Sequence, residues 1–163
     1  MSHARPVDVT LGRFTSFAVA LALFATLPAC QREVPPTQEG AVAVIQSHYK
    51  AINEERYQDA YADWESEGKA SGKSFLAFLN GYAQMDKVDV TTGTPGPIEG
   101  AAGSRSIIVP VEVTAHRQNG GQDRFTGTYT LRYNVVEGAK SKQRRWQLYS
   151  SKLDPVERAD SLS

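Results

Sequence analysis

Residues 44–64 read VIQSHYKAINEERYQDAYADW, and their pattern is the main indication of the fold. With Val42 just before it, the first half places apolar side chains at three- and four-residue spacing, at Val42, Ile45, Tyr49 and Ile52. The second half repeats this spacing at Tyr57, Ala60, Tyr61 and Trp64. Such a period is typical of amphipathic helices. The polar NEER segment between the stripes predicts a bend that joins two successive helices.

Outward from this stretch, one more helix is predicted before the pattern changes to strands. Its apolar stripe is Phe75, Phe78, Leu79 and Tyr82. After residue 85 the apolar residues alternate with polar ones, as in half-buried strands. The four strands expected are DKVDVTTG (86–93), SRSIIVPVEVTAHRQ (104–118), DRFTGTYTLRYNVV (123–136) and RRWQLYSSK (144–152).

Local residues indicate how these strands are arranged. The NGGQ segment at 119–122 favours a hairpin turn, because Gly and Asn accept a positive φ. Pro110 lacks a donor and Gly127 lacks a side chain, which suggests a bulge or bend in each long strand. The predicted fold class is therefore α+β, with N-terminal helices packed on a strongly curved four-stranded antiparallel sheet.

This order of elements, together with the quoted stretch, resembles the nuclear-transport-factor-2-like superfamily, a cystatin-like α+β cone. The resemblance covers roughly residues 41–152 and implies a curved sheet wrapped around a long N-terminal helix. The superfamily includes ketosteroid isomerase, whose first-helix tyrosine would correspond to Tyr49. The segment that would carry its catalytic Asp reads WESEGKASGKSFL and has only Glu65 and Glu67 as carboxylates. We therefore predict no catalytic residues and expect the domain not to be an enzyme.

The aromatic residues of the predicted core have two interpretations. They pack as core, or they line an apolar cavity inside the cone, since ligand sites are mostly apolar. The residues concerned are Tyr49, Tyr61, Trp64, Phe78, Tyr129, Tyr133 and Trp146. His48 lies off the first stripe and His116 on a polar strand face, so both are expected to be solvated.

The N-terminus has the layout of a secretory signal. Arg5 and Arg13 precede an apolar run over 14–27, which is shorter than the ~20 residues that cross a bilayer. The run ends in LPAC, which resembles a bacterial lipobox with Cys30 at the cleavage position. The resemblance implies diacylglyceryl attachment to the Cys30 sulfur, with further fatty acylation such as palmitate. It predicts a signal peptide over 1–29, a flexible tether over 30–40, the folded domain over 41–152 and a C-terminal tail over 153–163.

Composition and charge limit the function. Lys plus Arg and Asp plus Glu number 18 each, so no basic surplus indicates nucleic-acid binding. With one cysteine and three scattered histidines, the sequence predicts no metal site and no cofactor. A basic segment near the last strand suggests contact with an anionic surface through Lys140, Lys142, Arg144 and Arg145.

The leading functional interpretation is a membrane-anchored envelope lipoprotein whose domain binds a small apolar ligand or an envelope protein partner without catalysis. Gln31 after the cysteine favours the outer membrane, facing the periplasm. One alternative is an isomerase- or hydratase-like enzyme that uses the cone cavity. Another is an assembly factor that binds through the sheet face, where Thr126, Thr128, Thr130 and Arg132 form a polar row. A homodimer through that face also stays open.

Overall fold

The computed structural model describes residues 36–101, 103–135 and 144–156, all within one compact unit of the chain. Helices come first: α1 (Gln38–Asn53), α2 (Tyr57–Ala62), a 3-10 turn η1 (Lys69–Ser71) and α3 (Phe75–Tyr82). Strands follow: β1 (Met85–Thr92), β2 (Glu99–Ala101), β3 (Ser104–Arg117), β4 (Gln122–Asn134) and β5 (Trp146–Pro155). The expected α+β class with a curved antiparallel sheet is confirmed.

Helix α1 has clear signals at both ends. Thr37 is its N-cap, with Oγ1 accepting a hydrogen bond from the Gly40 amide at 3.1 Å. Because this cap precedes Gln38, the helix begins three residues before residue 41, inside the segment expected to be tether. At the other end, the Arg56 amide donates to the Ala51 carbonyl at 2.8 Å, and Glu55 has a positive φ of 56°. This is the Schellman arrangement, whose left-handed position is usually occupied by glycine.

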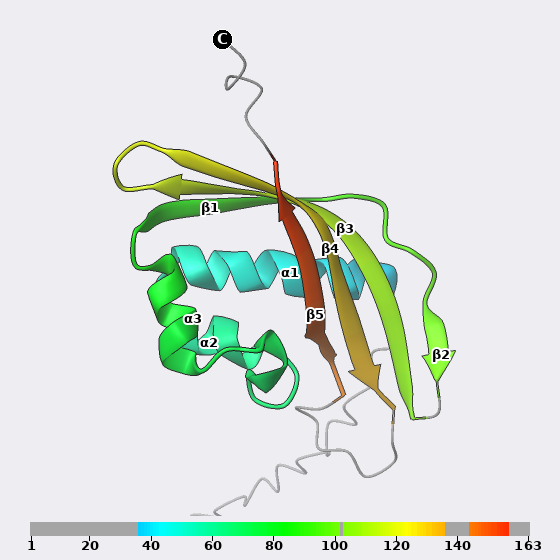
Figure 1. Cartoon of the computed structure of the whole chain (residues 1–163). Helices are drawn as coiled ribbons and strands as arrows, with labels where there is room; N and C mark the ends of the chain where they lie inside the picture. The colour runs from blue at the N-terminus through cyan, green and yellow to red at the C-terminus, as the bar shows by residue number, and fades with distance from the viewer. Residues whose placement is uncertain (1–35, 102, 136–143, 157–163) are drawn as a thin grey trace, which may run out of the picture. The chain divides into compact units, whose positions relative to one another are not determined.

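The sheet has the strand order β1-β3-β4-β5, and all neighbours are antiparallel. The short strand β2, which the sequence pattern did not reveal, continues the same edge of β3 that β1 occupies. The hairpin between β3 and β4 turns at Gly120, which has the expected positive φ, 83°. Figure 1 shows the strands arching over α1, with α2 and α3 beside the C-terminal half of that helix. Strand β5 runs to Pro155, into the segment assigned to the tail.

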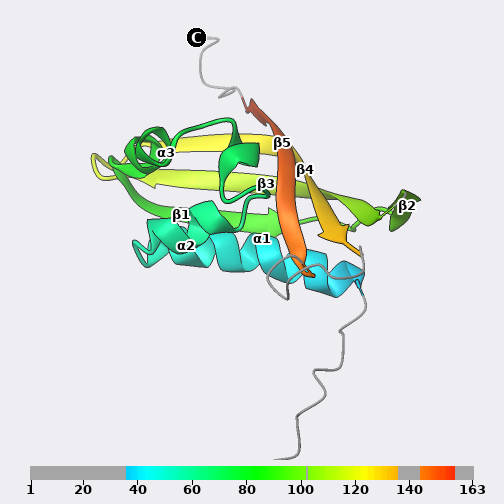
Figure 2. The ribbon, with the colours of Figure 1, turned by 90° about the horizontal axis from the view of Figure 1, so that it is seen from below.

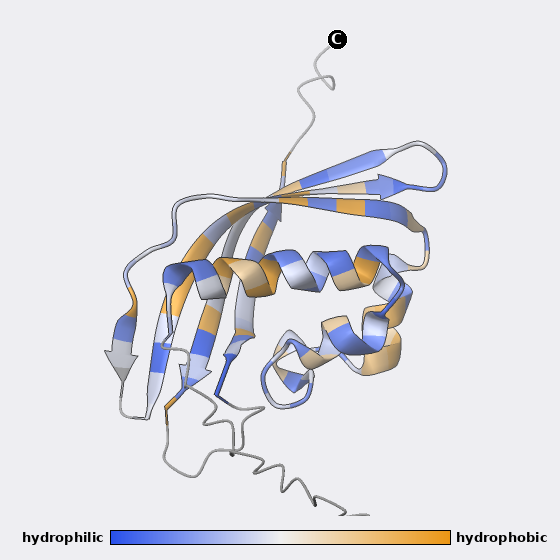
Figure 3. Ribbon diagram, turned by 180° about the vertical axis from the view of Figure 1, so that it is seen from behind, coloured by the Kyte–Doolittle hydropathy of each residue, from blue (hydrophilic) through white to orange (hydrophobic). Residues whose placement is uncertain are grey.

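The core lies between the inner face of the sheet and α1, which crosses that face in both ribbon views (Figures 1 and 2). Hydrophobic and hydrophilic residues alternate along the strands (Figure 3). Strand β3 buries Ile107, Val109, Val111, Val113 and Ala115 on one face, as the period of two predicts. The described residues include no helix long and apolar enough to cross a membrane.

A bulge or a bend was expected at Pro110 and Gly127, and there is no bulge between β3 and β4 at these residues, because the two strands pair without a register shift there. The shift in this part of the sheet lies between β4 and β5, at Thr130/Leu131. Gly127 has a different role. A Cβ atom at this position would overlap the Lys152 carbonyl of β5, so only glycine permits the observed approach of the two strands.

Candidate functional site

Two tyrosine hydroxyls meet inside the cone. Tyr49 on α1 and Tyr129 on β4 are each 3% exposed, and their hydroxyl oxygens lie 2.7 Å apart in a hydrogen bond. Burial raises the pKa of both phenols, and for Tyr49 the nearby Tyr129 and Tyr82 raise it further. Both phenols are therefore neutral hydrogen-bonding groups at physiological pH.

His48 is buried next to this pair, with 1% exposure, so the expectation of a solvated histidine was wrong. The sheet covers one side of α1, and helices α2 and α3 cover another side. The buried face of α1 is therefore wider than its apolar stripe. Nδ1 of His48 lies 3.0 Å from the Ala60 carbonyl oxygen, and it must be the protonated nitrogen in that bond. Nε2 of His48 and Nε1 of Trp64 have no hydrogen-bond partner among the described residues.

The aromatic residues named from the sequence pack as core. Trp64 and Phe78 contact the His48 ring edge-on, and Trp64 also packs against Tyr129. Tyr133 and Trp146 form a separate T-shaped pair, with Trp146 Nε1 donating to the Thr37 carbonyl at 3.0 Å. Tyr61 is partly buried, and its hydroxyl donates to the Lys73 carbonyl at 2.8 Å. None of the seven lines the cavity described next.

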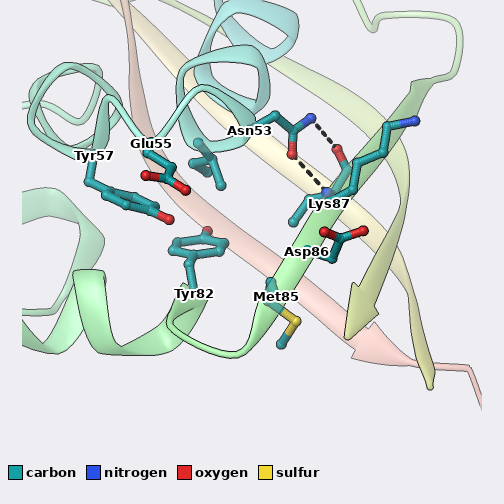
Figure 4. Close-up of a pocket in the computed structure, with 9 residues that line it drawn as sticks. Asn53, Glu55, Tyr57, Tyr82, Met85, Asp86 and Lys87 are labelled. Atoms are coloured by element: carbon teal, nitrogen blue, oxygen red, sulfur yellow. Dashed lines mark hydrogen bonds between the residues drawn. The ribbon is translucent and has the colours of Figure 1, made fainter. Parts of the chain in front are cut away.

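A small cavity of about 30 Å³ opens where the C-terminal ends of α1 and α3 meet the start of β1 (Figure 4). We call it the mouth site. Its lining residues are Ile52, Asn53, Glu55, Tyr57, Tyr82, Met85, Asp86, Lys87 and Val88. The hollow is partly open to solvent, and its exposed lining is mostly polar.

Asn53 holds this end of the cone together. Its side-chain amide donates to the Val88 carbonyl at 2.8 Å, and its side-chain oxygen accepts from the Val88 amide at 2.7 Å. Both bonds are drawn in Figure 4. They fix the last residue of α1 to the edge strand β1 and thereby position the wall of the mouth site.

The aromatic wall of the mouth site is formed by Tyr57 and Tyr82. Their rings lie nearly parallel, with 6.4 Å between centroids and an interplanar angle of 21°. Burial raises the pKa of Tyr82, so its phenol is neutral at physiological pH. Within the described part of the chain, neither hydroxyl has a hydrogen-bond partner.

The charged groups at the mouth are unequally paired. Lys87 Nζ contacts Asp89 Oδ1 at 2.7 Å, and its ammonium group points away from the two tyrosines in Figure 4. Glu55 and Asp86 have no ion pair or hydrogen bond with any other described residue. The available charge at the mouth site is therefore negative.

The sequence did not reveal this site. Tyr57 and Tyr82 belong to apolar helix stripes and look like ordinary core residues, and Glu55 and Asp86 lie in short connections. Only the tertiary structure brings the ends of α1 and α3 to β1. The positive φ of Glu55 was not predicted either, since no neighbouring residue indicates it.

The other candidate surfaces are partly occupied. Arg145 donates to the Ala62 carbonyl at 2.7 Å and contacts Asp63, so its guanidinium is engaged within the domain. Arg144 is described and also has an interaction, whereas Lys140, Lys142 and Cys30 lie outside the described residues. On the sheet face, the Arg132 guanidinium lies 3.5 Å from the Tyr149 ring centroid and contacts Glu65.

In the described ranges, no group of three or more His, Cys, Asp or Glu side chains is placed to hold a metal ion. His116 is partly exposed at the hairpin, where Nε2 contacts Asp89 at 3.0 Å. This contact is a surface interaction between β3 and β1.

Comparisons with protein-family models and with curated protein sequences find no match. Solved structures do match the fold. A Novosphingobium aromaticivorans protein with the provisional name scytalone dehydratase superposes with a TM-score of 0.53 and 6% identity, over 73% of this chain and 83% of that one. Aln2 from a Streptomyces species gives a TM-score of 0.48 and 11% identity, over 74% and 93%. A nuclear-transport-factor-2-like protein from Salmonella enterica gives 0.39 and 11%, over 72% and 97%.

The likeness to the Novosphingobium structure supports the expected fold and corrects one expectation. We expected the domain not to be an enzyme, because the Asp of the isomerase pattern is missing. That prediction was wrong, since a structure with this fold bears the name of a dehydratase. At 6% identity the likeness shows the fold alone and assigns no activity to this chain.

Proposed function

We propose that this protein is a lipid-anchored protein of the bacterial envelope whose cone domain binds a small ligand at the mouth site. The observation that carries the proposal is the mouth cavity itself. It is bordered by two tyrosine hydroxyls and two carboxylates that have no partner among the described residues. Because the exposed lining of the mouth site is mostly polar, a ligand there would be held mainly by hydrogen bonds and charge.

The interior of the cone supports placing the ligand at its end. Tyr49, Trp64, Phe78 and Tyr129 pack against one another or against His48, so they fill the central space with side chains. The mouth site, by contrast, keeps space at the surface and polar atoms that face it. A ligand would approach there without unfolding the core.

Binding is tested with the purified detergent-extracted protein, labelled with ¹³C at the methionine methyl groups. Met85 lines the mouth site and is the only methionine besides Met1. We expect a set of small neutral, anionic and cationic compounds to include members that shift the Met85 methyl resonance. If no compound shifts it at millimolar concentration, the mouth site is not a ligand site.

The anchor rests on the LPAC sequence and is tested separately. Cys30→Ser removes the thiol that would carry the lipid, so the variant should leave the membrane fraction and lose incorporation of labelled palmitate. Ser47→Ala, an exposed position on α1, serves as the matched control and should stay in the membrane fraction. Membrane retention of the Cys30→Ser protein would refute the anchor while leaving the ligand site intact.

A further inference from the structure

We propose that the outer edge of strand β5 pairs with the same edge of a second copy of this chain, in antiparallel orientation, so that the two sheets join. This surface is separate from the mouth site, none of whose lining residues belongs to β5. Three observations carry the proposal: the contrast between the two edges of the sheet, the outward backbone groups of β5, and a sequence that is complementary to itself.

Strand β1, at the opposite edge of the sheet, is closed to a further strand. Both backbone groups of Val88 that point away from β3 are bonded to the Asn53 side chain, at 2.7 and 2.8 Å. The pairing with β3 is irregular between Met85 and Lys87, and Lys87 and Asp89 place charges on this edge strand. Bulges, charges and coverage by a neighbouring element are the means by which proteins keep edge strands from pairing with other chains.

Strand β5 forms the other edge, and only its beginning is bonded to a neighbouring segment. The Leu148 amide donates to the Asp63 carbonyl at 2.9 Å, and the Leu148 carbonyl accepts from the Glu65 amide at 2.8 Å. The turn η1 also approaches the strand, yet residues 149–152 are exposed. Beyond Leu148, no described residue forms a hydrogen bond with the outward backbone groups of β5.

The ladder between β4 and β5 determines which backbone groups of β5 face the sheet. The Val156 amide donates to the Arg124 carbonyl at 2.8 Å. This orientation alternates along an antiparallel strand, so the backbone groups of Lys152 and Asp154 also face β4. The Lys152 carbonyl agrees with this assignment, because it lies where a Cβ atom of Gly127 would be.

The residues between them point their backbone groups away from the sheet. The amides and carbonyls of Ser151 and Leu153 are therefore available to a further strand. Pro155 takes the next outward position, and proline is tolerated there because it has no N–H to leave unpaired. The free edge thus runs from Ser151 to Pro155, where β5 ends.

The sequence of this segment is complementary to itself when the second copy runs in the opposite direction about Leu153. Leu153 then exchanges backbone hydrogen bonds with Leu153 of the second copy, and the Ser151 amide donates to the Pro155 carbonyl of that copy. Lys152 lies opposite Asp154 of the second copy, and two-fold symmetry repeats this pair. Such a position is not hydrogen-bonded through the backbone, so the two side chains approach closely.

Neighbouring registers are less favourable. Centring the pair on Lys152 places two ammonium groups directly opposite each other, and centring it on Asp154 does the same with two carboxylates. Centring it on Ser151 extends the second copy alongside Leu148, whose outward groups are already bonded. The register about Leu153 avoids both problems, which is why we commit to a second copy as the partner.

The experiment uses the full-chain, detergent-extracted protein at concentrations from about 1 to 200 µM, the range suited to a small interface. Light scattering should show a monomer that becomes a dimer as the concentration rises. Amide hydrogen exchange at Ser151 and Leu153, followed by NMR, should slow in parallel. The amides of Lys152 and Asp154 face β4 and should exchange at rates that do not depend on concentration.

Charge exchange tests the register. Lys152→Asp and Asp154→Lys each place like charges opposite each other in two symmetric pairs, so each should weaken the dimer about tenfold. A chain with both substitutions restores opposite charges and should dimerise within about twofold of the wild-type affinity. Lys73→Asp makes the same change in charge at an exposed position outside β5 and should leave the dimer unchanged.

A backbone substitution tests the edge itself. Ser151→Pro removes an outward N–H while leaving the backbone groups that face β4, so it should abolish dimerisation and retain a cooperative urea transition. Ser151→Ala keeps the N–H and should dimerise like the wild-type protein. If Ser151→Pro does not fold, the charge series decides alone.

The outcomes are distinguishable. A protein that stays monomeric up to about 200 µM would overturn the proposal. So would a dimer in which the Ser151 and Leu153 amides exchange as fast as in the monomer, or one that the charge substitutions do not affect, since such a dimer forms through another surface. None of these results bears on the ligand site, which is read at Met85.

Discussion

Removing one hydroxyl of the Tyr49–Tyr129 pair should be more destabilising than removing both. Each side chain is 3% exposed, and the two oxygens are 2.7 Å apart. Tyr49→Phe leaves the Tyr129 hydroxyl buried without its partner, at a cost of about 1–3 kcal/mol, and Tyr129→Phe does the same to Tyr49. The double variant removes donor and acceptor together and should lose only the net hydrogen bond, about 1 kcal/mol.

The assay is urea unfolding followed by tryptophan fluorescence, since both tryptophans, Trp64 and Trp146, are buried. With a slope near ~2 kcal/mol/M, each single variant should lower the midpoint by about 1 M and the double variant by about half of that. The coupling energy of the cycle should then be about 2–3 kcal/mol. Additive single costs, or a double variant less stable than either single variant, would refute the account of a shared buried hydrogen bond.

The same variants have a signature at high pH. The folded-state pKa of both tyrosines is raised above the ordinary value of 10.0. The unfolded chain therefore loses these protons first, and stability present below pH 10 falls as the pH rises through the folded-state pKa values. Each tyrosine contributes a loss of about 1.4 kcal/mol per pH unit above pH 10. Between pH 9 and pH 11, the double Phe variant should lose about 2–3 kcal/mol less than the wild-type protein.

Two further substitutions test how the sheet and the mouth are held. Gly127→Ala should destabilise the domain by about 3 kcal/mol in the same urea assay, because the new Cβ atom would overlap the Lys152 carbonyl. Gly81→Ala is the control, since Gly81 lies on an open and exposed part of α3. This control should stabilise the domain by about 0.5–1 kcal/mol. Asn53→Ala should lower the free energy of unfolding by about 2 kcal/mol and speed amide hydrogen exchange at Val88, because both side-chain hydrogen bonds to the Val88 backbone are lost. Unchanged exchange at Val88 would show that β1 does not depend on these hydrogen bonds.

Periodicity predicted the elements well because burial follows one face of each helix or strand. The stripe at Phe75, Phe78, Leu79 and Tyr82 corresponds to α3, which spans Phe75–Tyr82 in the structure. Alternation along β3 likewise identified its buried face. Signals of this kind are local, so one sequence is enough to read them.

The candidate site could not be predicted, because it depends on contacts between residues that are distant in the sequence. His48 is buried because both the sheet and the helices α2 and α3 cover α1. A pattern of apolar residues along one helix face does not predict burial on a second face. Tyr57 and Tyr82 are far apart in sequence and meet only when α3 returns toward the end of α1. Gly127 shows the same limit, since its close neighbour is the Lys152 carbonyl on another strand. Local reasoning predicted a bulge or bend at Gly127 and did not predict the close approach of β5.

In the chain, the proposed anchor precedes the N-terminal end of α1, whereas the mouth site includes residues at the C-terminal end of that helix. The helix has 16 residues and is therefore about 24 Å long, with Gln38 at its N-terminal end and Asn53 at the mouth site. Residues 30–37 span at most ~28 Å when fully extended. If Cys30 carries a lipid, as proposed, this segment would link the membrane to the N-terminal end of α1, and the length of the helix separates that end from Asn53 at the mouth site. A water-soluble ligand would then reach the mouth site without competing with the proposed lipid attachment.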